Sequence, residues 1–157
     1  MDRIDNAILA ALQNDGRMSN KELAAVVGLA PSSCLERVRR LHERGVIRGY
    51  HAEIDPAGVG IGLQAFISVR LAKHTREAVD AFRDHLVSLP EVVSIYHVAG
   101  QEDFMAHVAV RDANHLKNLT LDAFTTRTEV ARLNTALVYD RVSESAWPNY
   151  ATDDERS

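Results

Sequence analysis

The sequence has a single cysteine, Cys34, and no long apolar run. One cysteine excludes a disulfide within the chain, and its place on an apolar stripe indicates a small buried hydrophobe. No apolar run approaches the roughly 18 residues that a membrane-spanning helix needs. The stretch 1–15 is acidic at its start and lacks the small-residue cleavage site of a signal peptide. These absences predict a cytoplasmic protein without a membrane partner.

Patterns for metal, nucleotide and hydrolytic chemistry are also missing. The 7 histidines are scattered, and none forms an H-x₃-H pair or a cluster with the cysteine. Gly60 and Gly62 form a G-x-G pattern, but a strand-like stretch follows where a dinucleotide site needs a helix. No P-loop, nucleophile elbow or H-E-x-x-H pattern occurs. We therefore expect no metal, no cofactor and no catalytic residue.

The net charge of −4 is unevenly spread along the chain. Residues 1–50 hold 8 Lys and Arg against 6 Asp and Glu, a net charge of +2. Residues 51–157 hold 10 against 16, a net charge of −6. Five arginines and one glutamate fall between Arg37 and Arg48. A local positive field of this kind is what binding to a DNA groove requires.

A helix is predicted within residues 28–45, GLAPSSCLERVRRLHERG. Pro31 suits the first helical position because its missing N–H costs nothing there, and Gly45 suits the residue just past the end. At about 100° per residue, one face collects the apolar residues Cys34, Val38 and Leu41. The opposite face collects polar residues: Ser32, Glu36, Arg39, Arg40 and Glu43. A charged helix face is usually only solvated, so the neighbouring elements decide between that and a binding role.

Two further helices precede this one. Asp2 is the predicted cap of the first, which ends near Gly16 and carries the stripe Ile4, Ala7, Ile8, Ala11 and Leu12. Ser19 and Glu22 have capping-box spacing at the start of the second, whose inner side carries Leu23, Ala24, Val26 and Val27. Only the turn at Gly28 separates the second helix from the third. This arrangement predicts a helix-turn-helix, whose last helix can enter a major groove.

Three segments flank the second half of the chain: two before it, at 46–55 and 56–62, and the tail from Pro148 after it. In residues 46–55, apolar and polar side chains alternate from Tyr50 onward, which predicts a strand. Residues 56–62, PAGVGIG, are rich in glycine and are interpreted as a hinge and domain boundary. The tail from Pro148 is polar and is predicted to be disordered.

In the second half, the spacing of apolar residues switches between that of strands and that of helices. Strands are predicted at 63–71, 92–99, 103–110 and about 129–142, with helices at 76–89 and 112–124. This β-α-β-β-α-β order is ferredoxin-like. Because the strands carry apolar residues on both faces, we expect a second copy to cover the face without helices.

Together these patterns predict an α+β protein with four parts. They are a three-helix, winged-helix-like helix-turn-helix domain over 1–50, a strand and hinge over 51–62, a ferredoxin-like domain over 63–142 and a polar tail over 143–157.

The stretches DRIDNAIL, NDGRMSNKELA and GLAPSSCLERVRRLHERGVIRGY resemble the Lrp/AsnC (leucine-responsive, feast/famine) family of transcription regulators. The later stretch LPEVVSIYHVAGQEDF resembles that family's effector-sensing domain. The resemblance covers about residues 1–142 and implies a regulator that binds double-stranded DNA, forms homodimers that assemble to octamers, and responds to an amino acid. Ala30 departs from the family's usual serine cap, at a cost of about 1 kcal/mol unless Ser32 or Ser33 compensates. Cys34 stands where a valine is common, which fits a buried hydrophobe.

The predicted DNA contacts all lie on the third helix: Ser32, Ser33, Glu36, Arg37, Arg39 and Arg40. Arg39 and Arg40 can reach guanine edges or phosphates, and the serines can donate to phosphates at the helix N-terminus. Arg37 borders the apolar face, so a structural salt bridge is an equal alternative for it.

The predicted effector site centres on the loop Gly100, Gln101, Glu102 and Asp103. On composition alone this loop is a tight turn between two strands. The family resemblance instead places it, with Thr125, Thr126 and Glu129, at an amino-acid site between dimers. Backbone N–H groups of the turn can bind a carboxylate, while Glu102 or Asp103 binds an ammonium group.

An enzyme is the alternative function. Some proteins with a similar two-domain layout are decarboxylases that act on siroheme-type tetrapyrroles. Such an enzyme needs a large cleft with basic and histidine groups for many carboxylates. Here the second half is acidic and the arginines gather on the third helix, which favours the regulator.

Overall fold

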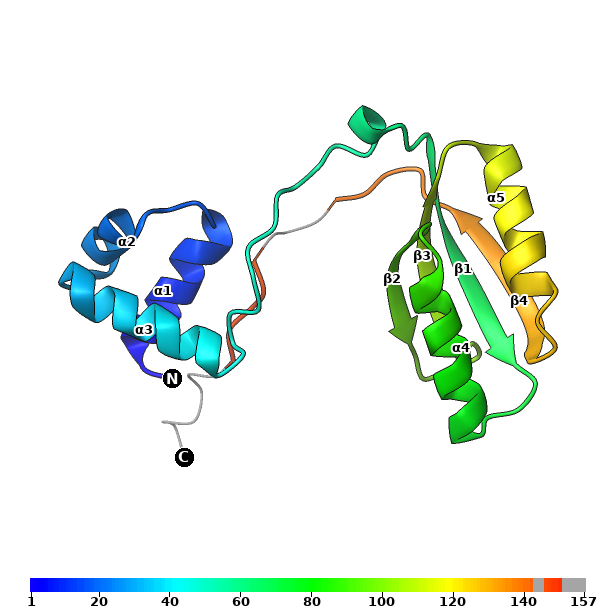
Figure 1. Cartoon of the computed structure of the whole chain (residues 1–157), viewed down its shortest axis with the longest axis horizontal. Coiled ribbons are helices and arrows are strands. Elements are labelled where there is room, and N and C mark those ends of the chain that lie inside the picture. The colour runs from blue at the N-terminus through cyan, green and yellow to red at the C-terminus, as the bar shows by residue number, and fades with distance from the viewer. Residues whose placement is uncertain (143–145, 151–157) are drawn as a thin grey trace. The chain divides into compact units, whose positions relative to one another are not determined.

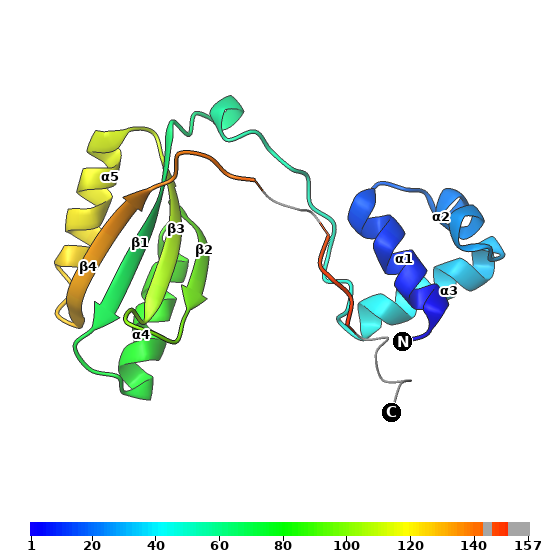
Figure 2. The same ribbon diagram turned by 180° about the vertical axis from the view of Figure 1, so that it is seen from behind.

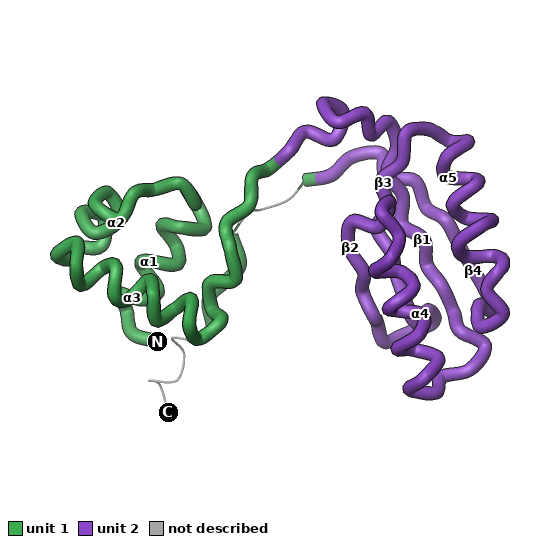
Figure 3. Tube along the Cα trace, viewed as in Figure 1, with its two compact units in different colours: residues 1–53, 142–157 green, residues 54–141 purple. Residues whose placement is uncertain are grey.

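The computed structural model describes residues 1–142 and 146–150, which form two compact units (Figure 3). The first unit contains residues 1–53 together with the described C-terminal residues from Val142 onward, and the second contains residues 54–141. Within the described residues, no helix has the length and apolar character to cross a bilayer.

The first unit is built from three helices, α1 (Arg3–Asn14), α2 (Asn20–Val27) and α3 (Pro31–Glu43) (Figure 1). Each boundary has a local cause. Capping boxes start α1 and α2, at Asp2 with Asp5 and at Ser19 with Glu22. Glycines end α2 and α3 in the left-handed conformation, with φ of 70° at Gly28 and 69° at Gly45. The three predicted helices are confirmed.

The core of this unit is small and apolar, and it contains Ile8, Leu23, Ala24, Cys34, Leu41 and Ile47. Cys34 is fully buried, as predicted. The stripe assignment is wrong for Ala7, which is exposed, and for Val26, which is 65% exposed. Val26 lies about 100° around the helix from Val27, so it falls on the flank of α2 and not on its inner side.

The segment 46–55 is not a strand, contrary to the alternation of its side chains. A strand exists only where a neighbour accepts and donates its backbone hydrogen bonds, and the described chain places no such neighbour beside these residues. The N–H groups of Val46 and Ile47 instead close the end of α3, donating to the carbonyl of Leu41 at 2.9 and 3.2 Å.

The glycines of the predicted hinge have different roles. Residues Ala57–Val59 form a short 3₁₀ turn that Gly60 ends with a φ of 80°. Gly62 is required for packing, because a Cβ there would collide with the carbonyl oxygen of Arg111. Its N–H also donates to the carbonyl of Val110 at 3.1 Å. Gly62 therefore holds the start of the second unit in place and does not act as a free hinge.

The second unit has the predicted β-α-β-β-α-β order. Its elements are β1 (Leu63–Leu71), α4 (Arg76–Ser88), β2 (Val92–His97), β3 (Phe104–Val110), α5 (Ala113–Leu119) and β4 (Val130–Leu137). The sheet is antiparallel with the order β2-β3-β1-β4, and both helices cover one face (Figures 1 and 2). The ferredoxin-like prediction is confirmed.

Two boundaries of this unit differ from the prediction. The second helix changes from α to a π-helical turn at Thr120–Thr125. The last strand ends at Leu137, where its pairing with Ala65 ends near the start of β1. Residues beyond Leu137 have almost no neighbouring strand left to pair with, which is why the predicted strand to 142 is too long.

The core of the second unit lies between the sheet and the two helices. Phe82 of α4 is its centre, with ring centroids 5.3 Å from Phe104 and 6.5 Å from Phe124. The opposite face carries no helix. There the Phe66 ring stacks on His107, whose Nε2 lies 2.9 Å from Oε1 of Gln64. Burial, and then the charge of Arg141, lowers the pKa of His107, which favours the neutral ring on this face.

The described part of the tail contacts the first helix. The backbone N–H of Trp147 donates to Oε1 of Gln13 at 2.6 Å, and the Asn149 side-chain amide donates to Oδ1 of Asn6 at 2.8 Å. Asn149 thus contacts α1, although it lies in the part of the chain that the sequence predicts to be a disordered tail. Residues 143–145 and 151–157 lie outside the described part of the chain.

Candidate DNA-binding helix and effector loop

The outer face of α3 presents two arginines to solvent. The side chains of Arg39 and Arg40 are 60% and 68% exposed. Both donate to Glu36, with Arg39 Nη2 at 2.7 Å and Arg40 Nε at 3.1 Å from its Oε1, and Arg39 also donates to Glu43 at 3.0 Å. The hydrogen bond from Arg39 lowers the pKa of Glu36, so this carboxylate is ionised. Exposed pairs of this kind are weak, at about 0–1 kcal/mol, so phosphate or guanine can replace them.

The first turn of α3 is left without a side-chain cap. Ala30 occupies the capping position in an extended conformation and offers no acceptor. Ser32 and Ser33 are exposed, and neither hydroxyl makes a hydrogen bond within the described residues, so neither compensates for the missing cap. Uncapped N–H groups beside two hydroxyls form a site suited to a phosphate.

Restoring the cap should stabilise the first unit. We expect Ala30→Ser to raise the free energy of unfolding by about 1 kcal/mol, because a serine hydroxyl accepts from the first-turn N–H groups. Ala30 already has the φ of −66° and ψ of 143° that a cap requires. Urea titration of the variant beside Ala30→Val, which adds no acceptor, measures the effect. Equal stability of the two variants would contradict it.

Arg37 has a structural role in the described chain. Its Nη1 donates to Oδ2 of Asp2 at 2.6 Å and to Oδ1 of Asp5 at 2.8 Å, which joins α3 to the capping box of α1. The Asp5 N–H, followed by Arg37, lowers the pKa of Asp2. Of the two alternatives for Arg37, these contacts match the salt bridge and not the DNA contact.

Asn20 is a positioning residue that the sequence patterns did not reveal. Its side-chain amide donates to the carbonyl of Pro31 at 2.8 Å, which fixes the start of α3 against the start of α2. Asn20 follows the Ser19 cap directly, and an amide there looks like part of the capping signal. The contact depends on the turn between the helices, so only the fold reveals it.

Both carboxylate oxygens of Asp103 have partners within the second unit. Its Oδ2 accepts the N–H of Leu71 at 2.7 Å, and its Oδ1 lies 3.0 Å from Nδ1 of His74. Its own N–H donates to the carbonyl of Val69 at 2.9 Å. Gln101 is also tied to β1, because its carbonyl accepts from Arg70 at 3.1 Å. These contacts pin the loop to the end of β1 and leave Asp103 little capacity for a ligand.

Glu102 differs from its neighbour. Its Oε2 atom is buried and has no hydrogen-bond partner among the described residues. A buried carboxylate oxygen without a donor is costly, and native proteins rarely leave one without reason. Gly100 gives the loop the φ of 148° that this conformation requires, which favours glycine. Oε2 of Glu102 is therefore an acceptor atom of the loop that no described residue uses.

The second predicted effector segment lies at the same end of the sheet. The hydroxyls of Thr125 and Thr126 donate to carbonyls within the π-helical turn, at 3.0 and 2.7 Å. Glu129 pairs with Arg127, and its carbonyl accepts the N–H of Ala72 at 2.8 Å. Leu71 and Ala72 thus separate the loop from this segment, and no hydrogen bond joins the two sets within the described chain.

A three-helix unit with an exposed arginine face, followed by a ferredoxin-like unit with a polar loop, defines a class of protein: a DNA-binding regulator with a ligand-binding domain. Residues 1–42 match the AsnC-type helix-turn-helix domain, and residues 64–148 match the Lrp/AsnC ligand binding domain. The chain belongs to the Lrp/AsnC family of transcriptional regulators.

Individual relatives agree with this assignment. The HTH-type transcriptional regulator AldR of Mycolicibacterium smegmatis is 44% identical over 142 residues, which cover 90% of this chain and 83% of that protein. The leucine-responsive regulatory protein of Escherichia coli K12 is 34% identical over 145 residues, covering 92% and 88%. A crystal structure of a Neisseria meningitidis transcriptional regulator in complex with L-methionine superposes with a TM-score of 0.85 at 32% identity, covering 92% of this chain and 93% of that one.

Proposed function

We propose that this regulator senses an amino acid at the loop 100–103 and that the bound amino acid changes its assembly or its DNA binding. The observation that carries the proposal is the buried, unpartnered Oε2 of Glu102. An ammonium group supplies the missing donor, and the charge-assisted hydrogen bond offsets the cost of burial. The L-methionine complex of the Neisseria relative supports an amino acid as the ligand class.

The remaining groups of an amino acid have candidate partners at the same end of the sheet. The N–H groups of the turn at Gly100 and Gln101 can bind the carboxylate. No hydrogen bond or ion pair joins Thr125, Thr126 or Glu129 to the loop among the described residues. We propose that they approach the loop of a neighbouring copy. A site shared between copies makes ligand affinity depend on assembly, which is the differential interaction that linkage requires.

The proposed DNA contacts are Ser32, Ser33, Glu36, Arg39 and Arg40. Arg37 is left out of this set because Asp2 and Asp5 bind it. One α3 helix reads half a site, so we propose a two-fold dimer that presents two such helices about 34 Å apart on one face of the DNA.

Two surfaces support the dimer. The extended segment 46–55 has no strand partner among the described residues, and the same segment of a second copy would pair with it and remove that exposed edge. The face of the sheet without helices carries the partly buried Phe66 and Met105, which a second sheet would cover. By family resemblance, we propose that dimers assemble further to octamers.

Purified protein tests this proposal directly. Thermal-shift screening against the twenty amino acids should identify a stabilising ligand, and light scattering in its presence and absence should show dimers or larger assemblies. A monomer at micromolar concentration, or the absence of any stabilising amino acid, would contradict it. The named relatives are regulators, which favours this function over the tetrapyrrole decarboxylase. An absorbance change with turnover on an iron tetrapyrrole would reverse that preference.

A further inference from the structure

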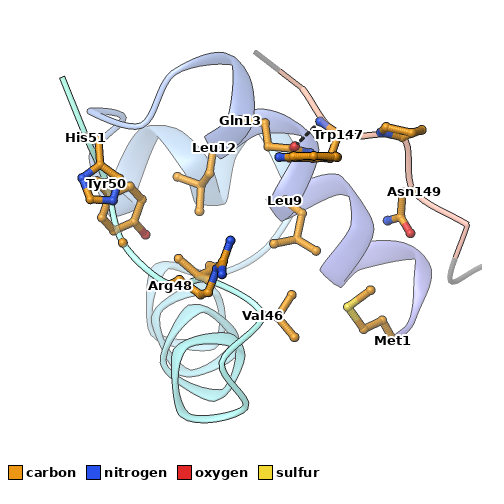
Figure 4. A pocket seen from close by; sticks show the side chains of 13 residues that line it. Met1, Leu9, Leu12, Gln13, Val46, Arg48, Tyr50, His51, Trp147 and Asn149 are labelled. Carbon is orange, nitrogen blue, oxygen red and sulfur yellow. Dashed lines mark hydrogen bonds between the residues drawn. The ribbon is translucent and has the colours of Figure 1, made fainter. Parts of the chain in front are cut away.

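A cavity of about 440 Å³ lies within the first unit, whereas the effector loop belongs to the second (Figure 4). It is lined by Met1, by the second half of α1, by residues 46–51 after α3 and by residues 147–149 of the tail. Its volume is within the range of small-molecule sites, about 300–1,000 Å³. Its apolar walls are formed by Met1, Leu9, Leu12, Val46, Ile47, Tyr50 and Trp147.

The tail wall of the cavity is held by specific contacts. The Trp147 N–H donates to the Gln13 side chain at 2.6 Å, and Asn149 donates to Asn6 at 2.8 Å. Both acceptors lie on α1. The residue Trp147 is 83% exposed. The backbone of this segment is therefore anchored by its hydrogen bond, while much of the aromatic side chain remains uncovered. Figure 4 shows this indole beside Gln13, with Leu9 and Val46 directed into the space below it.

The polar side chains among the described lining residues are neutral or basic. Among the described residues that line it there is no aspartate or glutamate. Arg48 makes no ion pair or hydrogen bond with a described residue, and its guanidinium points into the cavity (Figure 4). The Oε1 of Gln13 is already used by Trp147, so its amide offers only N–H donors. An arginine that no described acidic residue pairs with, beside apolar walls, is complementary to a carboxylate that carries a hydrocarbon group.

We propose that this cavity binds a small apolar carboxylate, such as an aryl or branched-alkyl carboxylic acid. The carboxylate pairs with Arg48, and the hydrocarbon group packs on Leu9, Leu12 and Trp147. An amino acid is a poor occupant, because its ammonium group meets no carboxylate among the described lining residues. A ligand in this position bridges α1 and the tail, so its binding holds residues 147–149 on the DNA-binding unit.

Trp147 is the only tryptophan, so its emission reports directly on the cavity. Titration of the full-length protein with hydrocinnamate should shift the emission to shorter wavelength and saturate. The neutral hydrocinnamyl alcohol and phenylalanine should each bind at least about tenfold more weakly, because one charge-assisted hydrogen bond accounts for about that factor. Arg48→Gln should weaken hydrocinnamate binding by about tenfold or more. Arg17→Gln, which removes a charge outside the cavity, should bind as the unaltered protein does.

A second variant, Val46→Phe, tests whether ligand binding can be blocked without unfolding the protein. Val46 is 40% exposed, so Val46→Phe should fold normally and fill the cavity, abolishing the hydrocinnamate response. No saturable response at millimolar hydrocinnamate, equal affinity for the alcohol, or unchanged affinity of Arg48→Gln would each overturn the proposal. Trp147 emission that depends on protein concentration and not on hydrocinnamate would overturn it as well, because a second copy would then be the occupant.

Discussion

The variant Arg39→Ala/Arg40→Ala is expected to bind DNA about a hundredfold or more weakly than the unaltered protein. Each bidentate contact of an arginine with guanine is worth about 1–3 kcal/mol, so two contribute about 2–6 kcal/mol, and a hundredfold loss corresponds to about 2.7 kcal/mol within that range. If they contact phosphates, the slope of log affinity against log salt should fall by about two. Both side chains are more than half exposed, so the melting temperature should change little.

A matched control tests whether charge alone explains the loss. Arg76→Ala/Arg83→Ala removes the same charge from α4 in the second unit, where Arg83 also pairs with acids on its own helix. Anisotropy titration with DNA selected from random sequence by the unaltered protein measures both variants across a salt series. If the α3 variant keeps its affinity and salt slope, or if the α4 control loses as much, α3 is not the recognition helix.

Glu36 pairs with both arginines of the proposed DNA-binding face. In the free protein it neutralises Arg39 and Arg40, which keeps these long side chains ordered on one face of α3. If α3 is the recognition helix, we expect the Glu36 carboxylate to accept from a cytosine amino group on DNA, while the released arginines bind guanine or phosphate. Such an exchange would favour specific sites, because a wrong base would offer no donor to Glu36 and would leave its charge unpaired.

The helices were predictable because their signals are local. Asp2, Ser19 and Pro31 mark starts, and Gly28 and Gly45 mark ends, all within a few residues of the boundaries they set. The order of elements in the second unit followed in the same way from the spacing of apolar residues. That order predicted the ferredoxin-like arrangement of the four-stranded sheet.

What the sequence could not predict depends on contacts between distant residues. The segment 46–55 has the alternation of a strand, but pairing requires a neighbour that its own chain does not place there. Gly62 has the composition of a hinge, yet the backbone of Arg111 packs against it. The two acids of the effector loop are adjacent in sequence, but Asp103 is occupied by the N–H of Leu71 and by His74. Oε2 of Glu102 has no hydrogen-bond partner among the described residues.

The variant Glu102→Gln is expected to lose the response to the amino acid that stabilises the unaltered protein. Glutamine keeps the size of the side chain but removes the charge that pairs with the ammonium group. A coupling of about 1–3 kcal/mol between ligand and DNA corresponds to a change in DNA affinity of about 5–150-fold, and this change should disappear. Basal DNA binding should stay within a few fold, because Glu102 lies in the second unit and α3 in the first.

Asp103→Ala cannot replace this experiment. Removing Asp103 leaves the N–H of Leu71 without its acceptor, at a cost of about 1–3 kcal/mol, so a lost response there could follow from a disordered loop. Glu102 makes no hydrogen bond through its buried oxygen, so Glu102→Gln should melt at or above the temperature of the unaltered protein. Glu77→Gln, the same change at an exposed position of α4, should respond normally. A stable Glu102→Gln protein that still changes its DNA affinity with the same amino acid would show that the loop serves only as a turn.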